Sequence, residues 1–174
     1  MDPIKSAAVK VLVSGAIVAV LAFRIHRGKR PREWWGLVRP ALPAALAWIA
    51  LYLGWMALSD ALTGWRGPWD FRPWQAAPVL ASAMRVIAVC ALGPIAEELV
   101  FRGLLFGWLR ERIGVLATIL LTAAGWSLLH VDYSWQVIAI IFVDGLLLGL
   151  ARQRTGSVYV PIAMHMLYNL YAIW

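Results

Sequence analysis

Two adjacent carboxylates and an arginine interrupt a stretch of the chain that is otherwise apolar from Pro78 to Leu109. Side chains four apart share one face of a helix, so Glu98 and Arg102 can form an ion pair, whereas Glu97 points elsewhere. An unpaired carboxylate in an apolar environment is a strong base. Ionisable groups at bilayer depth usually mark a functional site. The spacing therefore makes Glu97 a candidate general base and makes Glu98 and Arg102 candidate supporting residues.

Two histidines and an asparagine are further candidate catalytic residues. His165 and Asn169 are also four apart, so they share a helix face, and both can donate hydrogen bonds to a developing oxyanion. His130 lies near the outer end of another apolar run, where it could help Glu97 polarise a water molecule. Asp144 lies in the middle of a further run and would either orient a histidine or line a wet cavity. Together these residues indicate hydrolysis by an activated water.

The same side chains leave a metal-dependent alternative open. Glu97, His130 and His165 would give three ligands and one open position, which suits a catalytic zinc ion. A glutamate and imidazoles can also activate water without a metal, and we expect no cofactor. Cys90 is the only cysteine, which excludes a disulfide or a thiolate metal cluster within the chain.

The elements that position these groups must lie in a membrane. Of the 174 residues, 62% are hydrophobic and only 14% are charged, which is more apolar than a soluble domain can cover. The net charge of +7 comes from short basic segments between apolar runs, as the positive-inside rule produces, and this distribution argues against nucleic-acid binding. We therefore expect an integral membrane protein that is in contact with membrane lipids.

The apolar runs predict an all-α polytopic membrane bundle of about six transmembrane helices around a buried polar site. Pro94 should kink the third and longest helix one turn before the carboxylates, and Gly93 should permit close packing there. Residues 33–37 are expected to form an interfacial foot. The predicted spans are 6–23, 41–58, 86–109 (within a helix over 76–113), 115–130, 136–151 and 157–174.

The basic segments predict the orientation of the bundle. In the six-span arrangement the clusters at 24–32, 110–112 and 152–154 all fall on one side, which should be cytoplasmic, so that the N-terminus lies outside. Residues 1–75 then hold two N-terminal spans, a basic cytoplasmic loop and an outer Trp-rich loop. Residues 76–174 form a four-span core that carries the candidate site, and we expect one structural domain overall.

Three motifs, in order on successive predicted spans, resemble the membrane proteases that include the type II CAAX prenyl endopeptidases and bacteriocin-processing enzymes. The run from Phe142 through Gly145 to Gly149 also resembles that family, and the resemblance covers roughly residues 78–169. Trp126 stands where the second motif of the family usually has Phe. The three motifs are Glu97-Glu98-x-x-x-Arg102, Trp126-x-x-x-His130 and His165-x-x-x-Asn169.

The resemblance implies a glutamate intramembrane protease of a short bacterial type, placed in the inner membrane. It assigns Glu97 and His130 to the water and His165 and Asn169 to the oxyanion, as helix spacing also suggests. Glu98 and Arg102 would shape the site. The substrate would be a membrane-associated or C-terminally tailed protein. The alternative from another class is a non-catalytic membrane protein, either an immunity factor or a proton-coupled carrier, that uses the same buried groups.

Overall fold

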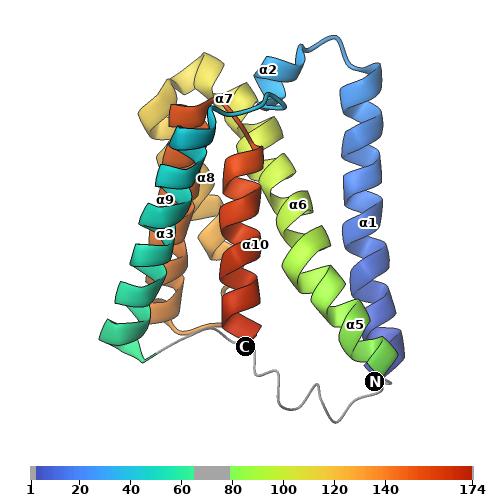
Figure 1. The fold of residues 1–174 in the computed structure, drawn as a ribbon. Coiled ribbons are helices and arrows are strands. Elements are labelled where there is room, and N and C mark those ends of the chain that lie inside the picture. Colours follow the sequence, from blue (N-terminus) through green and yellow to red (C-terminus); the bar gives the residue numbers. More distant parts are fainter. Residues whose placement is uncertain (1–2, 65–78, 174) are drawn as a thin grey trace.

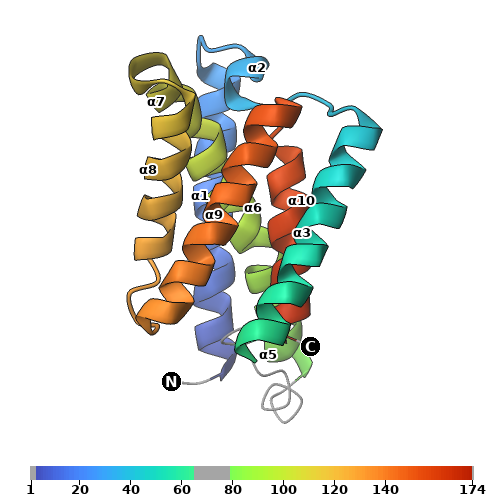
Figure 2. The same cartoon turned by 90° about the vertical axis from the view of Figure 1, so that its left-hand side faces the viewer.

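The computed structural model describes residues 3–64 and 79–173, which form a helical bundle without strands (Figures 1 and 2). The expected Trp-rich loop lies mostly outside these residues. One long helix runs from Val79 to Ile113 in five consecutive segments: α5 (Val79–Ile87), η1 (Ala88–Leu92), α6 (Gly93–Glu98), η2 (Leu99–Leu105) and α7 (Phe106–Ile113). The other helices are α1 (Pro3–Arg27), α2 (Arg32–Trp35), α3 (Leu42–Thr63), α8 (Val115–Leu128), α9 (Trp135–Thr155) and α10 (Tyr159–Ile173).

The helix nearest the middle of the bundle is α10. It contacts α3, α9 and the η1–α6 part of the long helix, while α8 packs along α9. On the flank, α1 packs mainly against α5 and η1 (Figure 1). The last helix is therefore held between the long helix and α9, which is where its histidine and asparagine can meet polar groups from both.

Within the part of the chain that the structure describes, four helices are long and apolar enough to cross a membrane: α1, α3, the long helix and α9. Large apolar side chains on the outside of the bundle are exposed, such as Leu12 (69%) and Leu116 (73%), as expected for a lipid-facing surface. The structure thus agrees with a polytopic membrane bundle. The expectation of six full spans needs correction, because α8 has 14 residues and α10 has 15, so each rises only about 21–23 Å.

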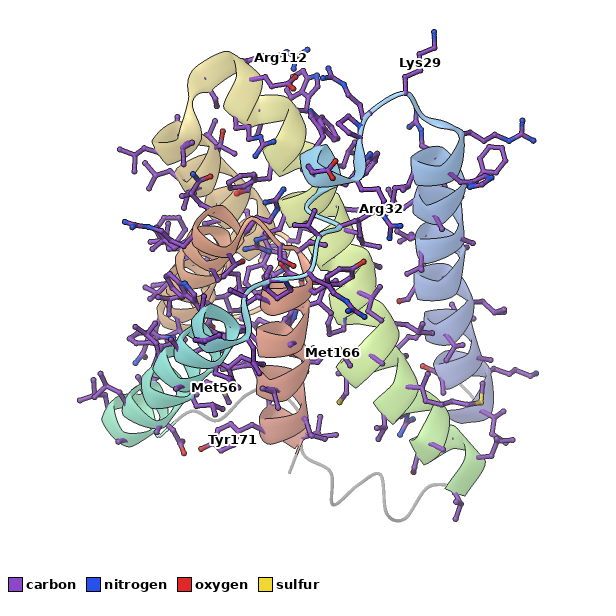
Figure 3. All side chains as sticks on the ribbon, turned by 45° about the horizontal axis from the view of Figure 1, so that its top comes forward. Lys29, Arg32, Met56, Arg112, Met166 and Tyr171 are labelled. Carbon is purple, nitrogen blue, oxygen red and sulfur yellow. The ribbon has the colours of Figure 1, made fainter. Side chains whose placement is uncertain are left out.

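The basic clusters lie at one end of the bundle, as expected. Figure 3 places Lys29, Arg32 and Arg112 at that end and Tyr171 at the opposite end. Nη1 of Arg30 lies 3.0 Å from Oε1 of Glu111, so the loop after α1 and the end of α7 are in direct contact. We call this the basic end.

The segment expected as an interfacial foot packs into the bundle instead. In α2, Trp34 and Trp35 are buried and belong to one apolar cluster with Leu99 of η2. Gly36 ends this helix with φ +77°, and a Cβ there would fall 2.5 Å from Cζ of Arg152. Only glycine suits both the conformation and the space.

The long helix contains two π-helical turns where a proline kink was expected. The N–H of Gly93 bonds to the carbonyl of Ala88, five residues back, so it bypasses the carbonyl of Val89. The N–H of Phe106 likewise bonds to the carbonyls of Phe101 and Gly103 and bypasses that of Arg102. Pro94, which follows the first π turn, has no N–H to offer. Each π turn therefore leaves one carbonyl available to another helix.

The α8–α9 contact is close because of two glycines. A Cβ at Gly145 would lie 3.0 Å from Cα of Ala123, and one at Gly149 would lie 3.2 Å from Cγ2 of Ile119. Both glycines therefore allow the two helices to approach closely. It also brings α8 close beside Asp144, the neighbour of Gly145 on α9.

Candidate functional site

A cavity of about 380 Å³ lies among the helices and is lined by all four candidate catalytic residues. Glu97 comes from α6, His130 from the turn after α8, and His165 and Asn169 from α10. Helix α1 closes one side, with Val9, Lys10, Val13 and Ser14 in the lining. Residues far apart in sequence thus share one hollow, whose mostly apolar wall carries these few polar groups.

Glu97 is half-buried. We had expected its carboxylate to be unpaired, but it has a hydrogen-bond partner. Nε1 of Trp126 donates a hydrogen bond of 2.7 Å to its Oε2. A hydrogen bond to a carboxylate is charge-assisted and fixes the orientation of the group. Its Oε1 remains as the second acceptor. Sequence reasoning missed this contact because it joins two helices 29 positions apart, although Trp126 opens the motif that ends in His130.

The geometry at His130 indicates its tautomer. Its Nδ1 lies 3.1 Å from the carbonyl oxygen of Trp126, and a carbonyl can only accept, so Nδ1 carries the proton. The Nε2 of the neutral ring is then an acceptor. The ring of Tyr133 stacks on His130 at 6.0 Å between centroids. Burial, followed by the neighbouring Asp132, raises the pKa of Tyr133, so this phenol stays neutral near physiological pH.

Glu98 and Arg102 form the expected ion pair, and both are fully buried. Nη1 of Arg102 donates to Oε1 of Glu98 at 3.0 Å, and its Nη2 donates to the carbonyl of Gly145 at 3.0 Å. The pair therefore also ties the long helix to α9. This arrangement compensates part of the cost of burying a guanidinium.

His165 contacts the same carboxylate oxygen, which the sequence did not indicate. Its Nδ1 lies 3.0 Å from Oε1 of Glu98, and the ring is buried. A carboxylate accepts, so Nδ1 carries the proton and Nε2 is left for other partners. Glu98 is thus more than a counter-ion for Arg102, because it also sets the tautomer and the orientation of His165. No local signal could reveal a contact across 67 positions.

Trp126 stands at the centre of these groups. Its ring makes edge contacts with His130 and His165, at 5.5 and 5.2 Å between centroids. The guanidinium carbon of Arg102 lies 4.9 Å from the ring centroid, within cation–π range. One buried aromatic side chain therefore touches the acid, both imidazoles and the buried cation.

Asn169 is oriented by the first π turn. Its Nδ2 donates a 2.7 Å hydrogen bond to the carbonyl of Val89, the carbonyl that Gly93 bypasses. One amide N–H is used in this way and the second remains. The irregularity around Gly93 and Pro94 thus has a local role, since it supplies an acceptor that a regular α-helix would have used internally.

Asp144 is buried, lines the cavity and accepts a 2.8 Å hydrogen bond from Nε1 of Trp55 on its Oδ1. Its other oxygen, Oδ2, has no hydrogen-bond partner among the described residues, and the same holds for Oε2 of Glu98 and Nε of Arg102. Buried polar atoms without partners are rare and often mark a site that receives water or a ligand.

The residues of the zinc alternative do not come together as a ligand set. Within residues 3–64 and 79–173, no three His, Cys, Asp or Glu side chains gather closely enough to hold a metal ion. The Nδ1 atoms of His130 and His165 are both engaged, by a carbonyl and by Glu98 respectively.

Comparison with known proteins shows the family. The model of the family described as "Type II CAAX prenyl endopeptidase Rce1-like" matches residues 79–171, more than half of the 174 residues. The chain is 28% identical over 134 residues to the "Uncharacterized 24.3 kDa protein" of Escherichia coli, covering 73% of this chain and 59% of that protein. No solved structure matches the chain at a comparable level.

A second relative carries a functional name. The "Putative membrane peptidase YdiL" of Bacillus subtilis (strain 168) is 26% identical over 95 residues, covering 55% of this chain and 38% of that protein. The chain thus spans less than two thirds of the length of either relative. The family match begins at α5 and ends within α10, so it includes every residue of the three motifs and both π turns. The chain belongs to the Rce1-like family of type II CAAX prenyl endopeptidases.

Proposed function

We propose that this protein is an intramembrane endopeptidase that hydrolyses a peptide bond of a membrane-associated or C-terminally tailed protein. We place it in a bacterial inner membrane with its N-terminus outside. The observation that carries the proposal is the cavity shared by Glu97, His130, His165 and Asn169 in a chain of this family. A cavity that brings together an acid and two imidazoles suits the activation of water.

The water is activated by Glu97 with help from His130. Because Trp126 holds Oε2 of Glu97, the free Oε1 can accept a proton from the water. Nε2 of His130 can accept a second hydrogen bond from the same water, since its Nδ1–H is turned to a carbonyl. As the water oxygen bonds to the substrate carbonyl carbon, its proton passes to Glu97, which later delivers it to the leaving amine as the C–N bond breaks.

The developing oxyanion is stabilised from α10. The second amide N–H of Asn169 is available once the first is bonded to Val89. In the resting Nδ1–H tautomer Nε2 of His165 is an acceptor, and it becomes a donor once the ring is protonated, while Glu98 on Nδ1 keeps the ring in one orientation. Asn169 thus provides a donor that is fixed in advance at the site of new negative charge, and protonated His165 adds a second, which lowers the barrier.

We further propose that the reaction needs no metal, in contrast to the zinc alternative. Elemental analysis of purified protein should find less than one zinc per chain, and chelators should leave activity intact. Stoichiometric zinc with loss of activity on chelation would replace this proposal by the zinc-dependent one.

The test is to compare the protein termini in membranes of a deletion strain that carries the wild type, Glu97→Gln or Glu33→Gln. Glu33 is an exposed carboxylate in α2, so it controls for the substitution itself. New C-terminal or N-terminal peptides should appear with the wild type and Glu33→Gln, and the uncut precursor should accumulate with Glu97→Gln. Removing the general base should slow cleavage by about 100-fold or more.

Two results would contradict the proposal in different ways. New termini that form equally with Glu97→Gln would exclude Glu97 as the base. If no terminus depended on the wild-type protein, while Glu97→Gln still impaired growth or export, the non-catalytic alternative would be favoured.

A further inference from the structure

Arg152 in the last turn of α9 belongs to a basic cluster by sequence, but its side chain is 1% exposed. Its Nε donates a 2.9 Å hydrogen bond to the carbonyl of Arg102. That carbonyl is the one bypassed by the N–H of Phe106 in the second π turn. A buried carbonyl needs a donor, so Arg152 satisfies the group that the π turn leaves open.

The guanidinium of Arg152 is enclosed from the other side by residues 34–38, which we call the strap. Its Nη2 lies 3.4 Å from the carbonyl of Trp34, and Gly36 packs directly on it. The strap is pinned to the α9–α10 turn, because Ser157 Oγ donates to the carbonyl of Val38 at 2.7 Å. In addition, the N–H of Val158 donates to the carbonyl of Gly36 at 2.8 Å. Arg152 is therefore held in one position.

From Arg102 the contacts continue without a break to the cavity. The Arg102 guanidinium bonds to Glu98 and to the carbonyl of Gly145, and Glu98 holds Nδ1 of His165. Arg102 is thus fixed twice by α9, at its carbonyl by Arg152 and at its side chain by Gly145. A shift of the Arg102 backbone would move Glu98 and turn the His165 ring.

We propose that Arg152 is a positioning residue for the candidate catalytic site, which acts through the Arg102 carbonyl and Glu98 to fix the orientation and tautomer of His165. This inference rests on the proposed function for its kinetic consequence, but its geometric consequence can be measured without activity. Arg152 does not line the cavity, so its loss should lower kcat and leave KM nearly unchanged.

The experiment uses Arg152→Met, which keeps the length of the side chain and removes every donor. In full-length protein labelled with ¹⁵N-histidine, the Nδ1 and Nε2 signals of His165 should shift and show mixed tautomers. The chain has three histidines, so spectra of His26→Gln and His130→Gln assign the His165 signals. For the substrate found by terminus analysis, kcat should fall on the order of ten- to a hundredfold.

Arg154→Met is the matched control, since Arg154 is an exposed arginine in the same helical turn. It should leave the His165 signals and kcat as in the wild type. Arg152→Lys keeps one donor for the Arg102 carbonyl and should recover part of both effects. Unchanged His165 signals in Arg152→Met, or equal changes in Arg154→Met, would overturn the inference.

A second perturbation keeps the inference testable if Arg152→Met does not fold. Gly36→Ala would push a Cβ into the Arg152 guanidinium while keeping its charge, and Gly64→Ala imposes similar backbone strain at φ +62° with no atom within 4 Å. His165 signals should shift in the first and not in the second, and equal spectra would overturn the inference. If Glu97→Gln had no effect on cleavage while these shifts appeared, the proposed function would fail and the positioning role would stand.

Discussion

At the scale of single residues, Trp126 decides the geometry of the candidate site. A Phe at this position could make the ring contacts with His130 and His165 but could not donate to Glu97. The indole N–H of this chain supplies that donor at 2.7 Å. The acid is therefore restrained by a side chain that belongs to the same motif as its proposed partner His130.

Trp126→Phe tests this restraint. The variant keeps the ring and removes only the N–H, so Glu97 gains rotational freedom and kcat/KM should fall about tenfold, in line with the loss of one charge-assisted hydrogen bond. Cleavage kinetics in detergent, with Trp135→Phe at an exposed position as control, measure the effect. A rate equal to that of the wild type would show that the indole contact has no part in activity.

Glu98 should matter more for stability than any exposed carboxylate of the chain. Glu98→Gln leaves the Arg102 guanidinium buried without its counter-ion, which costs about 3–5 kcal/mol of unfolding free energy. Glu111→Gln breaks the exposed pair with Arg30 and should cost about 1 kcal/mol or less. Unfolding at increasing concentrations of a denaturing detergent, followed by fluorescence, measures the unfolding free energy of both variants. Equal losses of free energy in the two variants would contradict the burial argument.

At the scale of elements, the two π turns connect the long helix to its neighbours. Each frees one carbonyl, and a side chain from another helix takes it: Asn169 bonds to Val89, and Arg152 bonds to Arg102. The same irregularity thus occurs on both sides of the Glu97–Glu98 pair. It orients one proposed oxyanion donor directly and the other through Glu98.

Pro94→Ala tests the first of these turns. The new N–H lies five residues after Val89 and can compete with Asn169 for its carbonyl, so the amide should lose its fixed orientation. We expect kcat to fall about three- to tenfold while the protein stays folded, since the hydrogen bond at stake contributes about 1 kcal/mol. Pro40→Ala, before α3, is the control. Full activity in Pro94→Ala would mean that Asn169 does not depend on the π turn.

The sequence predicts most helices to within a few residues, because long apolar runs interrupted by glycine and basic residues leave little choice of boundary. It also predicts the Glu98–Arg102 pair, since that contact depends only on helical spacing. The π turns escape prediction because one wider turn barely changes the apolar pattern around Gly93. The Trp126–Glu97 and Glu98–His165 contacts escape it because they depend on how separate helices pack.

At the scale of the whole molecule, the basic clusters lie together at one end of the bundle. The basic end brings together the loop after α1, the end of α7 and the end of α9, whereas the turn containing Tyr133 and the N-terminal end of α1 lie at the opposite end (Figure 1). Positive segments are retained on the cytoplasmic side of a membrane. The arrangement therefore supports an orientation with the N-terminus outside.

Cysteine labelling tests that orientation, because Cys90 is the only native cysteine and can be replaced by Ala. In that background, Lys5→Cys should react with a membrane-impermeant maleimide in intact cells. Lys29→Cys should react only after the cells are permeabilised. Both positions are exposed in the structure, so the two labelling patterns are comparable. The reverse pattern would place the basic end outside and contradict the proposal.

The shortness of α8 has a consequence for the surrounding lipid. Its outer face carries exposed leucines, such as Leu116 and Leu121, yet its 14 residues rise about 9 Å less than the hydrocarbon layer is thick. Acyl chains beside this helix meet a hydrophobic mismatch, which a bilayer commonly relieves by thinning. Local thinning beside the turn that holds His130 would bring the lipid headgroups closer to the imidazole. It would also shorten the path by which bulk water reaches the apolar interior of the bundle.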